Sequence, residues 1–193
     1  TGTGLPFAGA TWARGQKQLD TYMSSLGVHY AGRCAAEQAG LATRADSLHL
    51  ACLDQRFSQA SALIERFSQA DEKTVASALS AISKLPAVSL CGARSYVFGE
   101  RVAPPDERTA TRALEIRRAL AVAESLWATG TLDEARERIE AVVRESDELA
   151  FAPVTAEVKY LQGMLYEESG QNEEARAAWI AGYHAAVEGR HDY

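Results

Sequence analysis

The chain has 193 residues and a mass of 20.8 kDa, enough for one compact domain or two small packed units. Its 26 Asp and Glu residues outnumber its 20 Lys and Arg residues, and this acidity argues against nucleic-acid binding, which depends on a basic face. An apolar share of 47% and a charged share of 24% exclude a disordered or collagen-like protein. No stretch approaches the roughly 18 apolar residues of a membrane span, so we expect no span within the chain.

Helical periodicity dominates the first 85 residues, where apolar side chains recur at steps of three and four. We expect a long first helix, a second helix that Asp46 or Ser47 helps to start, and a short third helix capped by Asp71. The third helix should end before Pro86, because the residue before a proline disfavours the helical conformation. The apolar stripes behind these helices are Leu19, Met23, Leu26, Tyr30 and Cys34; Leu50, Leu53, Phe57, Ala60, Ile64 and Phe67; and Val75, Ala78, Leu79 and Ile82.

Residues 86–107 have a different composition, with three prolines and two glycines and no sustained period. We expect a connector here, between an N-terminal region of three helices over 1–85 and a C-terminal region over 108–193. Pro105 followed by Asp106 suits a helix start, because proline is tolerated in the first turn and acids complement the N-terminal dipole.

Four further helices are predicted after the connector, in two pairs. The turns 129–131 and 169–171 separate the members of each pair, and their glycines, Gly130 and Gly170, supply the left-handed conformation that ends a helix. The predicted fold class is therefore all-α, an antiparallel helical array. The apolar stripes are Ala113, Ile116, Leu120, Ala123 and Trp127; Leu132, Ala135, Ile139 and Val142; Val154, Val158, Leu161 and Leu165; and Ala175, Ala178, Trp179 and Gly182.

The two helix pairs repeat each other in sequence. At an offset of 40 residues, Gly130, Glu134, Ala135 and Arg136 recur as Gly170, Glu174, Ala175 and Arg176. This pattern resembles the tetratricopeptide repeat, a helix-turn-helix unit of about 34 residues. The resemblance implies a tetratricopeptide-like superhelix of two helix pairs, with the N-terminal helices as a cap. The segment between the copies, around Ala150–Thr155, is about six residues longer than in that family.

In the tetratricopeptide family, the first helix of each pair lines the concave face of the array. The resemblance therefore implies an aromatic and methionine strip rimmed by charges, which suits an amphipathic peptide or a protein partner. The alternative is that Trp127 and Tyr160 pack against the preceding helices. The family's clamp for C-terminal carboxylates is not reproduced, so we expect none. The predicted contact residues are Arg117, Leu120, Glu124 and Trp127 from one copy and Glu157, Tyr160, Met164 and Glu167 from the next.

Acidic residues concentrate in the C-terminal third, where residues 131–193 carry 14 acids and 6 bases. This crowding predicts either a solvated turn that keeps the protein soluble or an anionic patch for a basic partner. The acids nearest the second turn are Glu167, Glu168, Glu173 and Glu174.

A second resemblance covers nearly the whole chain. Its most distinctive piece is Ala51-Cys52-Leu53-Asp54-Gln55-Arg56, with Thr3-Gly4-Leu5-Pro6-Phe7-Ala8 before it and Pro104-Pro105 ahead of the repeats. These strings look like the region that follows the kinase domain in bacterial Ser/Thr protein kinases with tetratricopeptide tails, a family common in myxobacteria and their relatives. The resemblance implies that the chain is a piece of a longer protein and serves as a sensor or protein-interaction region. Ligand binding would change the spacing or pairing of attached kinase domains, so a homodimer is one expected arrangement.

The motifs of a kinase are missing from the sequence itself. There is no Gly-rich phosphate loop, no His followed by Arg-Asp, and no Asp-Phe-Gly. We therefore expect no catalytic residue, no cofactor and no metal. The strongest metal alternative is His184 with Glu188 one turn later and His191 close by. The rival functions are a stand-alone helical enzyme that uses His184 or a cysteine in a cavity, and a purely structural spacer or oligomerisation module.

Three cysteines leave two interpretations open. Cys34 and Cys52 flank the first interhelical turn at comparable distances, so a disulfide between them is one prediction, with Cys91 left over. The alternative is three buried reduced thiols. The disulfide would place the chain on the extracytoplasmic side of a membrane, whereas reduced thiols would place it in the cytoplasm.

Overall fold

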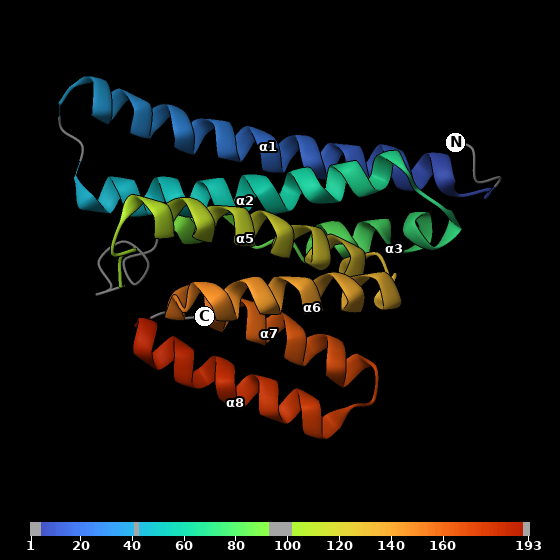
Figure 1. The fold of residues 1–193 in the computed structure, drawn as a ribbon. Helices are drawn as coiled ribbons and strands as arrows, with labels where there is room; N and C mark the ends of the chain where they lie inside the picture. Colours follow the sequence, from blue (N-terminus) through green and yellow to red (C-terminus); the bar gives the residue numbers. More distant parts are fainter. Residues whose placement is uncertain (1–4, 41–42, 93–101, 191–193) are drawn as a thin grey trace. The chain divides into compact units, whose positions relative to one another are not determined.

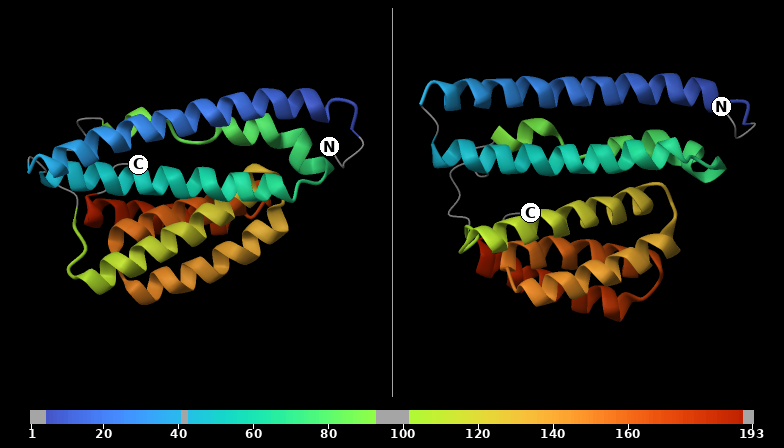
Figure 2. Two further views of the ribbon diagram at one scale, coloured as in Figure 1. Left: turned by 90° about the horizontal axis from the view of Figure 1, so that it is seen from above. Right: turned by 45° about the horizontal axis from the view of Figure 1, so that its top comes forward.

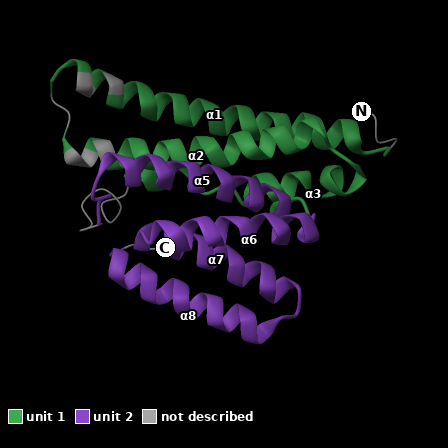
Figure 3. Cartoon of the chain, viewed as in Figure 1, with its two compact units in different colours: residues 1–98, 128–130 green, residues 99–127, 131–193 purple. Residues whose placement is uncertain are grey.

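The computed structural model describes residues 5–40, 43–92 and 102–190, except for the side chains at positions 34, 36, 37, 44, 45 and 47. This part of the chain is all-helical, as predicted, with 84% of its residues in helices and no strand. It divides into two compact units (Figure 3): unit 1 is Thr1–Phe98 with Ala128–Gly130, and unit 2 is Gly99–Trp127 with Thr131–Tyr193. The elements in chain order are α1 (Ala8–Gln38), α2 (Arg44–Ser68), α3 (Glu72–Ser83), the 3-10 helix η1 (Val88–Gly92), α5 (Glu107–Ala128), α6 (Leu132–Leu149), α7 (Ala152–Glu168) and α8 (Asn172–Gly189).

Unit 1 consists of α1, α2, α3 and η1. The long helices α1 and α2 run side by side, and α3 packs against both (Figure 1, Figure 2). The predicted apolar stripes supply most of the contacts, although Phe57 and Ile64 of the α2 stripe are exposed. Two buried groups form the core of this unit: Leu19, Leu63, Ala81 and Ile82 in one, and Leu26, Cys52, Leu53, Val88 and Cys91 in the other.

Polar caps fix the starts of α2 and α3. Asp71 is the N-cap of α3, as predicted, and its carboxylate accepts a hydrogen bond of 2.8 Å from the backbone N–H of Thr74. The N-cap of α2 is Thr43, and Asp46 helps to start the helix, as predicted. Asp46 takes part as the third residue of a capping box, in which Thr43 and Asp46 satisfy each other's backbone N–H groups.

The disulfide of unit 1 joins Cys52 to Cys91, with 5.5 Å between their Cα atoms. The predicted Cys34–Cys52 disulfide is therefore wrong, because Cys52 is already bonded and because η1 brings Cys91 against α2. Both bonded cysteines are completely buried. Residues 88–92, which fall in the predicted connector, thus belong to the packed core of unit 1.

Unit 2 contains α5 to α8, and α5, α6 and α7 share one apolar core. Gly130 and Gly170 have φ angles of +82° and +73°, so both turns use the left-handed conformation that the sequence predicted. The extra residues between the two helix pairs do not form a long loop. Instead, α6 ends at Leu149, Ala150 takes a left-handed conformation, and α7 begins at Ala152.

Small residues let α7 and α8 approach each other closely. A Cβ atom on Gly163 would lie 2.2 Å from Nε1 of Trp179, and one on Gly189 would lie 2.9 Å from the backbone nitrogen of Pro153. Neither position can accept a larger residue without a shift of its neighbour. Unit 2 therefore places its large apolar side chains where glycine leaves room for them.

One segment has the length and composition of a membrane span, Glu72–Gly92, with a mean hydropathy of 1.4 over its most apolar window. This finding corrects the expectation that no stretch comes near that limit. It is weak evidence for a span, because α3 ends at Ser83 and only the non-helical segment around Pro86 connects it to η1.

Candidate functional site

The predicted contact residues of the two helix pairs meet in an ion pair between α5 and α7. Nε of Arg117 donates to both carboxylate oxygens of Glu157, at 3.1 and 2.9 Å, and Nη2 donates to Oε1 at 2.7 Å. These residues are 40 positions apart, which is the offset of the sequence repeat. The ion pair therefore links equivalent turns of α5 and α7.

The ion pair between Arg117 and Glu157 is largely buried, which indicates a structural role. The Glu157 side chain is 1% exposed and that of Arg117 is 23% exposed. The prediction that Glu157 contacts a partner is wrong in this arrangement, because a buried carboxylate has no surface to offer. A buried charge that loses its partner is strongly destabilising, so Glu157 and Arg117 act together to hold α5 and α7 in register.

The other predicted contact residues divide between the core and the surface. Leu120 is buried, and Trp127 is half-buried and packs against the shared core of α5, α6 and α7. Trp127 thus packs within the core of its own unit, whereas the alternative from the sequence placed it against the preceding helices. On α7, Tyr160 is 46% exposed, in contrast to that alternative. The residues with surface to offer are Tyr160, Met164, Glu167 and, on α5, Glu124.

A polar network that the sequence did not predict joins α6 to α7. The hydroxyl of Tyr166 donates to Oε1 of Glu140 at 2.8 Å, and Nε2 of Gln162 donates to the same oxygen at 3.3 Å. Burial, followed by the hydrogen bond to Glu140, raises the pKa of Tyr166. These residues lie in three different turns, so spacing along the sequence carries no signal for the network.

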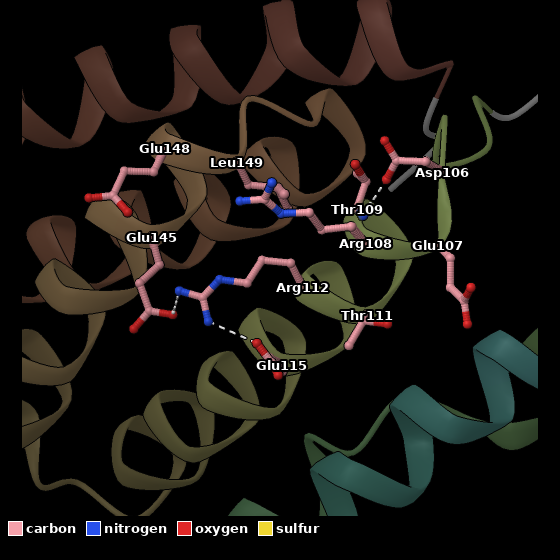
Figure 4. A pocket seen from close by; sticks show the side chains of 10 residues that line it. All are labelled: Asp106, Glu107, Arg108, Thr109, Thr111, Arg112, Glu115, Glu145, Glu148 and Leu149. Atoms are coloured by element: carbon pink, nitrogen blue, oxygen red, sulfur yellow. Dashed lines mark hydrogen bonds and ion pairs between the residues drawn. The ribbon is translucent and has the colours of Figure 1, made fainter.

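Unit 2 also has a charged, open hollow of about 860 Å³ where α5 begins and α6 ends (Figure 4). Arg112 lies at its centre and bridges two carboxylates, with Glu115 at 2.8 Å and Glu145 at 3.1 Å. Its lining holds five acids and two arginines, so the hollow is acidic on balance. The lining residues are Asp106, Glu107, Arg108, Thr109, Thr111, Arg112, Glu115, Glu145, Glu148 and Leu149.

Asp106 and Arg112 of this hollow have structural partners. Asp106 accepts a hydrogen bond of 2.7 Å from the backbone N–H of Thr109 and so caps α5; this bond is the main cause of its lowered pKa. The hydrogen bond from Arg112 to Glu115 is the main cause of the raised pKa of Arg112. Among the described lining residues there is no cysteine, histidine or serine.

An unusual histidine lies at the junction of α1, α2 and η1. The His49 side chain is 2% exposed, and its Nε2 has no hydrogen-bond partner. Its ring centre lies 5.5 Å from that of His29. Burial, and then the charge of Arg33, lower the pKa of His49.

No set of described residues has the composition of a metal site. Within residues 5–40, 43–92 and 102–190, no three His, Cys, Asp or Glu side chains come together in that way. His184 is exposed on α8, and its suggested companion His191 lies outside the described residues.

Comparisons with known proteins found no match for this chain. No protein-family model matches the chain, no curated protein matches it, and no solved structure matches it. The resemblances to tetratricopeptide repeats and to the tails of bacterial kinases therefore stay predictions.

Proposed function

We propose that the chain is a non-catalytic protein-interaction region with a tetratricopeptide-like C-terminal half. The observation that carries the proposal is the bidentate pair between Arg117 and Glu157. Contact between equivalent positions of successive copies is what stacked repeats require, because each repeat packs on its neighbour. The first helices of both pairs, α5 and α7, then share one face.

The proposed binding surface runs along that shared face. Tyr160 and Met164 supply aromatic and thioether contacts, and Glu124 and Glu167 supply negative charge at its edges. A surface of this kind suits a peptide that combines apolar and basic side chains. Residues 102–190 support this choice of partner, because they carry 17 acidic and 10 basic residues.

The proposal includes attachment to a Ser/Thr protein kinase. Binding on α5 and α7 would change the spacing or pairing of the attached kinase domains, and the chain itself would carry out no phosphoryl transfer. A kinase domain encoded directly upstream of Thr1 would support this context, and an upstream region without one would contradict it.

Selection from a displayed library of linear peptides tests the binding surface. The immobilised full chain should enrich peptides whose affinity falls about tenfold or more in the Tyr160→Ala variant, a typical loss for one contact residue. Val28→Ala is the matched control, because Val28 is 73% exposed on α1 of unit 1. If no peptide is enriched, the result favours a structural spacer. If the Tyr160→Ala and Val28→Ala variants lose the same amount of peptide affinity, the binding surface lies elsewhere on the chain.

A further inference from the structure

The outer face of α8 exposes large apolar side chains in three successive turns. Ile180 is 48% exposed, Tyr183 is 68% exposed and Val187 is 61% exposed. Single exposed apolar residues are ordinary, but these three follow one another at steps of three and four and so lie along one side of the helix.

Apart from Trp179, which lies against Gly163, the face that α8 turns towards α7 is made of small residues. Its buried positions are Ala175, Ala178, Gly182, Ala185 and Gly189. Gly182 lies against the backbone of α7, 3.6 Å from the nitrogen of Tyr160 measured from an added Cβ. A helix that packs small residues inward and displays large apolar ones outward is apolar on two sides, which is typical of a helix with neighbours on both.

Charge at one end of α8 limits what that second neighbour can be. Four acids surround the turn from α7 to α8: Glu167, Glu168, Glu173 and Glu174. Arg176 pairs with Glu173 at 3.1 Å, and all four carboxylates belong to exposed residues. An unbalanced group of acids beside an apolar stripe attracts a partner with apolar and basic residues.

We propose that the face formed by Ile180, Tyr183 and Val187 docks an amphipathic helix of a partner protein, with lysines or arginines at the end that lies over the α7–α8 turn. The apolar side of that helix covers the three side chains, and its basic end neutralises the four acids. The apolar part of this surface differs from the face of α5 and α7, with which it shares only Glu167 at the edge, and the inference does not rest on the proposed function.

Designed peptides provide the test with the full chain. The first probe is a helix of about 18 residues with a leucine stripe and four lysines at one end, long enough to be helical when bound. The second replaces the lysines by glutamates, and the third has the composition of the first with its stripe scrambled. We expect fluorescence anisotropy to show binding of the lysine peptide, at least about tenfold weaker binding of the glutamate peptide, and no binding of the scrambled peptide.

Variants locate the binding on α8. Tyr183→Ser combined with Val187→Ser should abolish binding of the lysine peptide, whereas Val28→Ser, an equally exposed apolar position on α1, should leave it unchanged. Glu173→Gln combined with Glu174→Gln should remove most of the salt dependence. Unchanged circular dichroism and melting temperature confirm that the variants fold, as expected for exposed positions.

Four results would overturn the proposal. They are failure of the wild-type chain to bind the lysine peptide, equal binding of the glutamate peptide, retention of binding by the α8 variant, and a wild-type dimer that Tyr183→Ser dissociates. The last result would assign the face to a second copy of the chain. Loss of binding in Tyr160→Ala alone, with the α8 variant unaffected, would place the peptide on the α7 face instead.

Discussion

Unit 1 and unit 2 are both stacks of helices, but different kinds of contact hold them together. In unit 1, the long helices meet through leucines, a disulfide ties α2 to η1, and polar caps at Thr43 and Asp71 fix the helix starts. In unit 2, glycines allow close approach, and a buried ion pair sets the register between α5 and α7. The disulfide constrains unit 1 whatever the detailed packing of the side chains around it. The close contact between α7 and α8 in unit 2 depends instead on the size of every side chain in it.

The largest expected effect concerns the disulfide of unit 1. Replacing Cys91 by Ser should lower the free energy of unfolding by about 4 kcal/mol, because the bond closes a loop with a sequence separation of 39. Urea denaturation followed by circular dichroism measures this loss. Cys34→Ser is the control and should leave the disulfide peptide of Cys52 and Cys91 in the mass spectrum. A mass spectrum with Cys34 bonded to Cys52 would contradict the pairing.

The ion pair of unit 2 should have the next largest effect. Glu157→Ala leaves the Arg117 guanidinium partly buried without its carboxylate, and we expect a loss of about 3 kcal/mol in the free energy of unfolding. Glu145→Ala is the matched control, since it removes a partner of Arg112 from a largely solvated pair and should cost less than about 1 kcal/mol. Equal losses in the two variants would show that burial does not distinguish these pairs.

Glycine-to-alanine substitutions should change the stability of the protein in opposite directions in the two units. Gly163→Ala forces Trp179 to move and should destabilise the protein by about 2 kcal/mol. Gly27→Ala in α1 meets no atom within 4 Å and should stabilise it by about 0.5 kcal/mol, because alanine favours the helix. Thermal melting of both variants checks this contrast. If Gly163→Ala melts at the wild-type temperature, the contact between α7 and α8 can accept an extra methyl group without cost.

The smallest expected effect is a pH dependence in unit 1. The pKa of His49 lies below its ordinary value in the folded chain, so the unfolded chain binds more protons as the pH falls below about 6.5. The free energy of unfolding should therefore decrease with falling pH. This decrease ends once the pH passes the folded-state pKa.

Urea denaturation between about pH 7.5 and pH 5 measures that decrease. His49→Gln should flatten the pH dependence, while His184→Gln, a change at an exposed position on α8, should leave it as it is. A steep dependence that survives His49→Gln would point to other groups. The charged or titratable groups that act on His49 within the described residues are Arg33, His29 and Asp46.

The parts of the fold that the sequence predicted correctly depend on short-range interactions. The start of α3 at Asp71, the left-handed turns at Gly130 and Gly170, and the end of α3 before Pro86 each follow from contacts within a few residues. At the start of α2 the sequence identified Asp46 but not its partner Thr43, because only the geometry of the capping box shows that the two residues act together.

The candidate site was predicted less well, for the same reason. The repeat indicated that Arg117 and Glu157 occupy equivalent positions, but it did not indicate that they bind each other and that Glu157 is buried. Trp127 and Tyr160 looked alike in the sequence, yet one packs on the core and the other is 46% exposed. Which side of a helix faces a neighbour depends on where that neighbour lies.

The all-helical fold, most helix boundaries and the repeat at an offset of 40 residues can be read from the chain alone, because hydrophobic period, caps and turn glycines act locally. Three features appear only once the helices are packed: the bond between Cys52 and Cys91, the pairing of Arg117 with Glu157, and the burial of His49. Those three features join residues on different elements, and their partners are selected by how the helices pack, which no local pattern encodes.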